Sequence, residues 1–217
     1  MPARLPRSTT TDRVPAPSTG RLPLVGRAAE LHTLLNALTD ADAKRGGALF
    51  VVGESGVGKT RLVAALAEQA AQRGFAVAVG RGYPVETGVP YAVFSDALLP
   101  LLRTVDRTAL TLLTRGGMAE LVQLFPALAG ASEAPVVAPR GDPAEVKARL
   151  LWNFSQFLSR YSAKRPLLVV LENLQWADGA SLEMLHFVAR QVGGDRLLVV
   201  CTHNDPELRT NPALRAT

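Results

Sequence analysis

A glycine-rich segment at residues 53–60, Gly-Glu-Ser-Gly-Val-Gly-Lys-Thr, constrains the fold of this chain more than any other feature. It fits the phosphate-binding P-loop pattern, in which a glycine and four variable positions precede Gly-Lys-Thr. The apolar run at 49–52 predicts a buried strand that enters the loop, and residues 61–69 predict the helix that leaves it. This order of strand, loop and helix predicts an α/β fold with the loop at the carboxyl end of a strand.

The chemistry of the loop explains its residue types. Gly53, Gly56 and Gly58 are expected to adopt positive φ angles, which turn backbone N–H groups toward an anion. Lys59 is expected to contact the β- and γ-phosphates, and the Thr60 hydroxyl to bind Mg²⁺. The alternative is a glycine-rich turn that holds no ligand. The strand and the helix on its two sides favour phosphate binding.

The composition indicates one domain of ordinary size. A chain of 217 residues with 47% hydrophobic residues fits a single α/β domain. No segment approaches the roughly 18 uninterrupted apolar residues of a membrane span. The single cysteine, Cys201, excludes an internal disulfide and agrees with a cytoplasmic location. Much of the net charge of +5 lies in the first 21 residues, and the chain has no dense basic run, so direct DNA binding is not expected.

The chain divides into a disordered leader at 1–22, rich in Pro, Ser, Thr and Arg, and a nucleotide-binding domain at 23–217. Apolar runs predict strands at 49–52, 75–79, 167–171 and 196–201, and helical periodicity predicts helices at 31–38, 61–73, 91–102, 107–114, 118–124, 146–161 and 180–191. Alternating strands and helices predict a doubly wound, mostly parallel sheet between two helix layers. Three residues after the second strand, Arg81, Tyr83 and Glu86, are interpreted as ordinary loop positions that could approach a nucleotide.

The predicted strand at 167–171 is followed directly by an acidic residue. P-loop NTPases hold Mg²⁺ through a carboxylate at the end of such a strand, and the run at 167–171 is followed by Glu172. The next residue, Asn173, cannot accept a proton from an attacking water. Asp178 is a candidate catalytic residue, but it precedes a predicted helix, and an N-cap role is equally open. We expect this strand to lie beside the P-loop strand.

Three segments together resemble one protein family. They are residues 24–31, in which Leu-Val-Gly-Arg is followed by Glu30-Leu31, the P-loop, and residues 165–190, RPLLVVLENLQWADGASLEMLHFVAR. They resemble the ATPase domain of the large ATP-binding LuxR-type transcriptional regulators, which are AAA+-related, Orc1-like signal-transduction ATPases. The resemblance covers roughly residues 23–210. Its most distinctive part is Leu-Gln-Trp-Ala-Asp at 174–178, which follows the predicted strand at 167–171.

The resemblance implies a set of site residues. The adenine and ribose lie near Val25, Gly26 and Arg27, and the phosphates are held by Gly53, Glu54, Ser55, Gly56, Val57, Gly58, Lys59 and Thr60. Positions 172 and 173 are the Walker B acids, with ATP and Mg²⁺ as the cofactors. The family usually has Asp-Asp there, whereas this chain has Glu172 and Asn173. The family also tends to carry an arginine shortly after the fourth strand, where this chain has Cys-Thr-His-Asn at 201–204.

The family's fifth strand and helical lid are not recognised before Thr217. The P-loop strand is therefore expected at an edge of the sheet, with unpaired backbone groups. We expect a truncated or minimal version of the domain, which is either only marginally stable or stabilised by a partner, through self-association or through further C-terminal regulator segments.

These features predict an ATP- or ADP-binding module of a signalling ATPase and transcriptional regulator, which acts as a nucleotide-dependent switch with weak or absent hydrolysis. Two alternatives stay open. One is a stand-alone P-loop enzyme such as a kinase or GTPase, although no Asn-Lys-x-Asp guanine motif occurs. The other is a degenerate protein-interaction module, which Glu172 and Asn173 favour.

Overall fold

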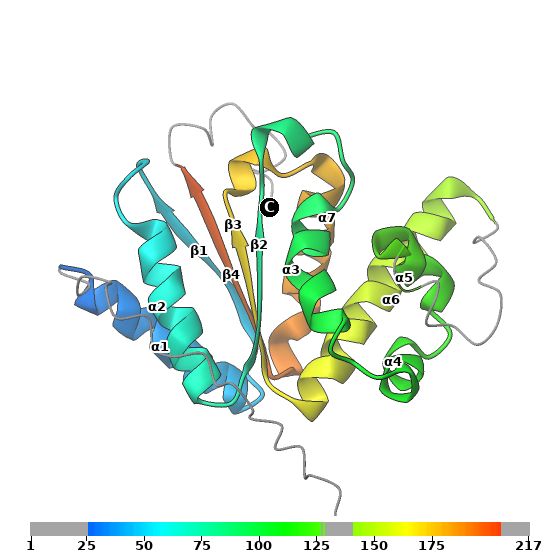
Figure 1. Cartoon of the computed structure of the whole chain (residues 1–217), viewed down its shortest axis with the longest axis horizontal. Helices are drawn as coiled ribbons and strands as arrows, with labels where there is room; N and C mark the ends of the chain where they lie inside the picture. The colour runs from blue at the N-terminus through cyan, green and yellow to red at the C-terminus, as the bar shows by residue number, and fades with distance from the viewer. Residues whose placement is uncertain (1–25, 127, 129–140, 205–217) are drawn as a thin grey trace, which may run out of the picture.

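The computed structural model describes residues 26–126, 128 and 141–204. The predicted leader at 1–22 and the candidate site residue Val25 lie outside these residues. A four-stranded parallel sheet forms the middle of the molecule, with helices on both of its faces (Figure 1). The predicted three-layer α/β fold is therefore confirmed.

The sheet has the strand order β1-β4-β3-β2. The strands are β1 (Gly47–Gly53), β2 (Ala76–Arg81), β3 (Leu167–Glu172) and β4 (Leu197–Asn204). As predicted, the P-loop strand β1 is an edge strand of this sheet. The prediction that β3 lies beside β1 is wrong, because β4 pairs with both of them. Seven of the eight β4 residues are buried, and a strand that is buried on both faces belongs in the interior of a parallel sheet.

The helices cover the sheet on both sides. One face carries α1 (Ala28–Asp42) and α2 (Lys59–Gln72), and the other carries α3 (Ala92–Leu102), α6 (Pro143–Lys164) and α7 (Gly179–Gln191) (Figure 1). Two shorter helices, α4 (Arg107–Thr114) and α5 (Met118–Leu124), pack against α6. Single 3₁₀ turns are η1 (Pro84–Glu86), η3 (Leu174–Trp176) and η4 (Val192–Gly194). None of the helices in the described part is long and apolar enough to cross a bilayer.

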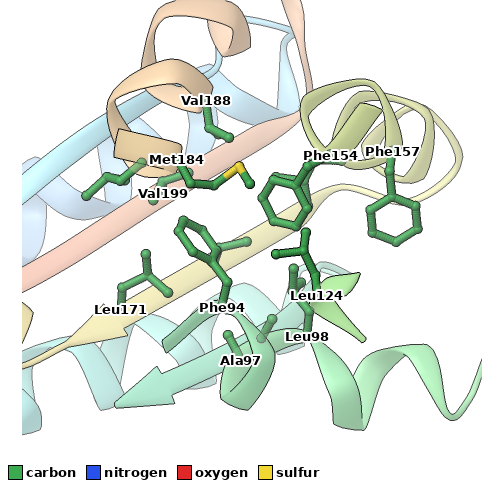
Figure 2. Close-up of a cluster of buried hydrophobic side chains, with 14 of the residues drawn as sticks. Phe94, Ala97, Leu98, Leu124, Phe154, Phe157, Leu171, Met184, Val188 and Val199 are labelled. Carbon is green, nitrogen blue, oxygen red and sulfur yellow. The ribbon is translucent and has the colours of Figure 1, made fainter. Parts of the chain in front are cut away.

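Two apolar cores hold these layers together. The alternation of side chains along β3 divides it between them, with Leu168 and Val170 in the core under α1 and α2 and Val169 in the core under α3, α6 and α7. In the larger core the rings of Phe94 and Phe154 meet edge to face, with centroids 5.2 Å apart (Figure 2). A sheet buried on both faces keeps its strands rigid, so residues at the strand ends are held in place.

Cys201 provides a chemical probe of this core. It lies in β4 with 0% exposure, and burial raises the pKa of its thiol. We expect the native protein to react with a thiol reagent about 100-fold more slowly than the unfolded chain, because the reactive thiolate forms only after local opening. Thiol labelling at pH 8 with and without denaturant measures this ratio on the chain's only cysteine. Equal rates in the two conditions would contradict the burial of Cys201.

Candidate functional site

The P-loop connects the end of β1 to the start of α2. Gly56 and Gly58 have φ angles of 80° and 98°, in the region that favours glycine. Gly53 does not have a positive φ, so the prediction for it is wrong. The reason is that Gly53 still belongs to β1, where it pairs with Asn204 of β4 and stays extended. The absence of a side chain still matters at Gly53, since an added Cβ would lie 3.2 Å from Cγ1 of Val57.

Within the described residues, the side chain of Lys59 is held over the loop by oxygen acceptors of the main chain and of Asn204. Its Nζ donates to the carbonyl oxygens of Gly53 at 2.8 Å and Glu54 at 2.9 Å, and to Oδ1 of Asn204 at 2.8 Å. Lys59 is also the first residue of α2, whose N-terminus carries a partial positive charge. The ammonium and the helix end together favour an anion at the loop.

The outer positions of the loop face solvent. Glu54, Ser55, Gly56, Val57 and Thr60 are all exposed, and Thr60 lies in the first turn of α2. An exposed loop between a strand and a helix N-terminus leaves its backbone groups accessible to a ligand.

Arg27 reaches this loop from the start of α1. Its Nη2 donates to the carbonyl oxygen of Val57 at 3.1 Å, and its Nη1 donates to Glu30 at 2.7 Å. Gly26, directly before it, has a positive φ of 76°. The structure thus brings Arg27 to the P-loop, with Gly26 next to it in the chain. Their role beside the adenine and ribose stays a prediction.

Glu172 ends β3 as a buried carboxylate beside an arginine. Its side chain is 3% exposed, and its Oε1 accepts a hydrogen bond from Nε of Arg81 at 3.1 Å. Arg81 is the last residue of β2 and stands opposite Glu172 in the sheet register. The hydrogen bond from Arg81 to the Glu172 carboxylate raises the pKa of the guanidinium. An ion pair therefore joins the carboxyl ends of β2 and β3.

Asn173 begins the turn after β3 in the left-handed conformation, with φ 60° and ψ 47°. Asparagine adopts this conformation more readily than most other residues. Its N–H donates to the hydroxyl of Thr202 at 3.1 Å, and its carbonyl oxygen accepts from the N–H of Trp176 at 2.9 Å. The turn is thereby tied to β4 and has a defined position.

Asp178 is the N-cap of α7. Its carboxylate accepts from the backbone N–H of Ser181 at 2.9 Å and also from the Ser181 hydroxyl. Of the two interpretations of Asp178, the capping role is confirmed. Both carboxylate oxygens take part in it, and a catalytic role stays a prediction.

Asn204, the last residue of β4, contacts both the P-loop lysine and the turn that follows β3. Its Oδ1 accepts from Lys59, and its N–H donates to Oε1 of Gln175 at 3.3 Å. The sequence predicts no site role for Gln175 and predicts a loop position for Arg81. Asn204 belongs to the run at 201–204, where the family tends to carry an arginine. A usable signal existed for Arg81, because it is a charged residue that closes the run at 75–80, as Glu172 closes its own run; Asn204 follows Thr202 and His203 and has no such signal.

The donor atoms at the site fit Mg²⁺. Mg²⁺ prefers hard oxygen ligands, such as the Glu172 carboxylate and the Thr60 hydroxyl. No group of three or more His, Cys, Asp and Glu side chains that could hold a metal occurs in the described parts of the chain. A metal ion at this site would therefore need phosphate oxygens or waters to complete its shell.

Comparison with known proteins identifies one family. Residues 23–200 match a family model described as an AAA ATPase domain. No curated protein matches this chain. Among solved structures, one similar chain belongs to the "Structure of Drosophila ORC bound to AT-rich DNA and Cdc6", with 11% identity and a TM-score of 0.37. The similarity covers 83% of this chain and 53% of that chain, so this chain spans about half of that chain's length.

Proposed function

Because this chain belongs to the AAA ATPase domain family, we propose that it is the ATP-binding module of a signalling ATPase, with weak or absent hydrolysis. One contrast supports this proposal. Lys59 is poised over the P-loop, whereas the residue that follows β3 is an amide, Asn173. The resemblance to LuxR-type regulators supports a role in transcriptional regulation, in which bound ATP holds one conformation as a switch.

The binding step uses groups that the chain already positions. Lys59 exchanges the carbonyl oxygens of Gly53 and Glu54 for phosphate oxygens, while Asn204 keeps its contact with the ammonium. The loop's backbone N–H groups and the N-terminus of α2 add further donors. Thr60 and Glu172 would hold Mg²⁺, which neutralises phosphate charge when it is bound.

Hydrolysis needs a group that takes the proton of the attacking water. The amide of Asn173 can orient a water but cannot accept its proton. The neighbouring carboxylate, Glu172, is engaged by Arg81. Both observations favour a site that retains ATP over one that cleaves it quickly.

Asn173→Asp tests the proposal, because it adds a proton acceptor at the position where the chain has an amide. We expect ATP affinity to stay within about twofold and steady-state phosphate release to rise about tenfold or more, since a general base contributes at least that much. Asn36→Asp is the control, since it makes the same charge change at an exposed position of α1.

Two outcomes would contradict the proposed function. A wild-type turnover of about one per second, lost in Lys59→Ala, would show an efficient ATPase. No thermal shift with ATP or ADP at millimolar concentration would indicate an interaction module that does not use nucleotide.

A further inference from the structure

The ion pair between Arg81 and Glu172 joins a half-exposed side chain to a buried one. The Glu172 side chain is 3% exposed, whereas the Arg81 side chain is 49% exposed. The backbone around Arg81 is held on two sides, because its N–H donates to Asp96 at 2.9 Å and the N–H of Gly82 donates to the Glu172 carbonyl at 2.8 Å. The guanidinium can therefore turn into solvent without a change in the strand.

The buried carboxylate of Glu172 needs a positive partner. A carboxylate removed from water is strongly destabilised unless a cation or hydrogen-bond donors replace its hydration. Arg81 supplies that partner through its Nε, at 3.1 Å from Oε1. If Arg81 leaves, a second cation has to take its place.

We propose that the Arg81 guanidinium and the Mg²⁺ that accompanies ATP are alternative partners of the Glu172 carboxylate. Arg81 is then a positioning residue. It holds the carboxylate in the nucleotide-free protein and sets the Mg²⁺ concentration at which the site binds Mg·ATP. Two cations at one carboxylate repel each other, and Mg²⁺ requires a nearly ideal octahedral shell, so the two partners compete. This inference rests on the proposed function, since it assumes that Mg·ATP binds at the P-loop.

Arg81→Gln tests the competition by removing the charge of one partner. ATP affinity is measured by calorimetry over a range of Mg²⁺ concentrations, beginning in EDTA. We expect the Mg²⁺ concentration that gives half of the total gain in affinity to fall about fivefold or more. Arg45→Gln is the matched control, because Arg45 forms an exposed ion pair with Asp40 at 2.6 Å and its loss makes the same charge change. Its Mg²⁺ profile is expected to match the wild type.

A second substitution shows whether the effect passes through Glu172. In a Glu172→Gln background, Arg81→Gln is expected to leave the Mg²⁺ profile unchanged, because the shared carboxylate is gone. Arg81→Lys keeps the charge without the planar guanidinium, and a shift of about twofold in the same direction is expected. It also provides a test if Arg81→Gln does not fold, as judged by circular dichroism.

The outcomes separate this inference from the proposed function. If the folded Arg81 variants bind ATP with the wild-type Mg²⁺ profile, the competition is wrong and ATP binding stands. A shift that persists in the Glu172→Gln background also overturns it, since Arg81 then acts elsewhere. If the wild-type protein binds no ATP at any Mg²⁺ concentration, the proposed function fails and the inference fails with it.

Discussion

Gly80→Ala is expected to lower the free energy of unfolding by about 3 kcal/mol, because β2 has no room for a side chain at this position. A Cβ on Gly80 would lie 2.1 Å from the carbonyl oxygen of Val93 and 2.7 Å from the backbone nitrogen of Ala97. Both atoms belong to the main chain of α3, which cannot rotate away as a flexible side chain can. The helix as a whole would have to move off the sheet.

Movement of α3 would disturb the larger core. Phe94 and Leu98 project from α3 into that core, where Phe94 meets Phe154 of α6 (Figure 2). Packing at this density does not absorb a shift of the helix without opening gaps or straining rotamers. The loss of stability therefore exceeds what one added methyl group suggests.

Gly47→Ala is the matched control for this prediction. Gly47 is the first residue of β1, and an added Cβ there has no atom within 4 Å. Urea denaturation of the two variants and the wild type, followed by circular dichroism, measures the difference in unfolding free energy. Losses for the two variants that agree within about 0.5 kcal/mol would show that α3 does not pack closely on Gly80.

Lys59→Ala is expected to weaken the binding of Mg·ATP about 100-fold or more, because truncating one partner of a close charge pair costs several kcal/mol. The ammonium is the one side-chain cation that the structure places directly on the carbonyl oxygens of Gly53 and Glu54, within the described residues. Its replacement leaves phosphate binding to backbone N–H groups and the end of α2.

Calorimetric titration of Mg·ATP measures this loss, with Lys164→Ala as the control. Lys164 is exposed in the last turn of α6, so the control removes one positive charge away from the P-loop. The thermal midpoint of Lys59→Ala without nucleotide reports any effect on folding, which we expect to be small because the loop faces solvent. A dissociation constant equal to that of the control would contradict a phosphate-binding role for Lys59.

Much of the fold could be predicted from local patterns. The apolar run at 167–171 is a strand buried on both faces, as its composition predicts. The segments with helical periodicity at 107–114 and 118–124 form α4 and α5. The strand ends were harder to predict. Strands β2 and β4 continue through Arg81 and Asn204, because backbone pairing with a neighbouring strand does not depend on side-chain polarity.

The P-loop and the strand and helix beside it can be recognised from local signals alone, because the glycine spacing, Lys59 and the flanking apolar residues lie within a few residues of one another. The contact of Asn204 with Lys59 and the pairing of Arg81 with Glu172 arise from the folding of the whole domain. Those contacts follow from the strand order β1-β4-β3-β2, which brings together the ends of segments far apart in the chain. No local pattern encodes that order, because it results from which apolar strand gains most from burial on both faces.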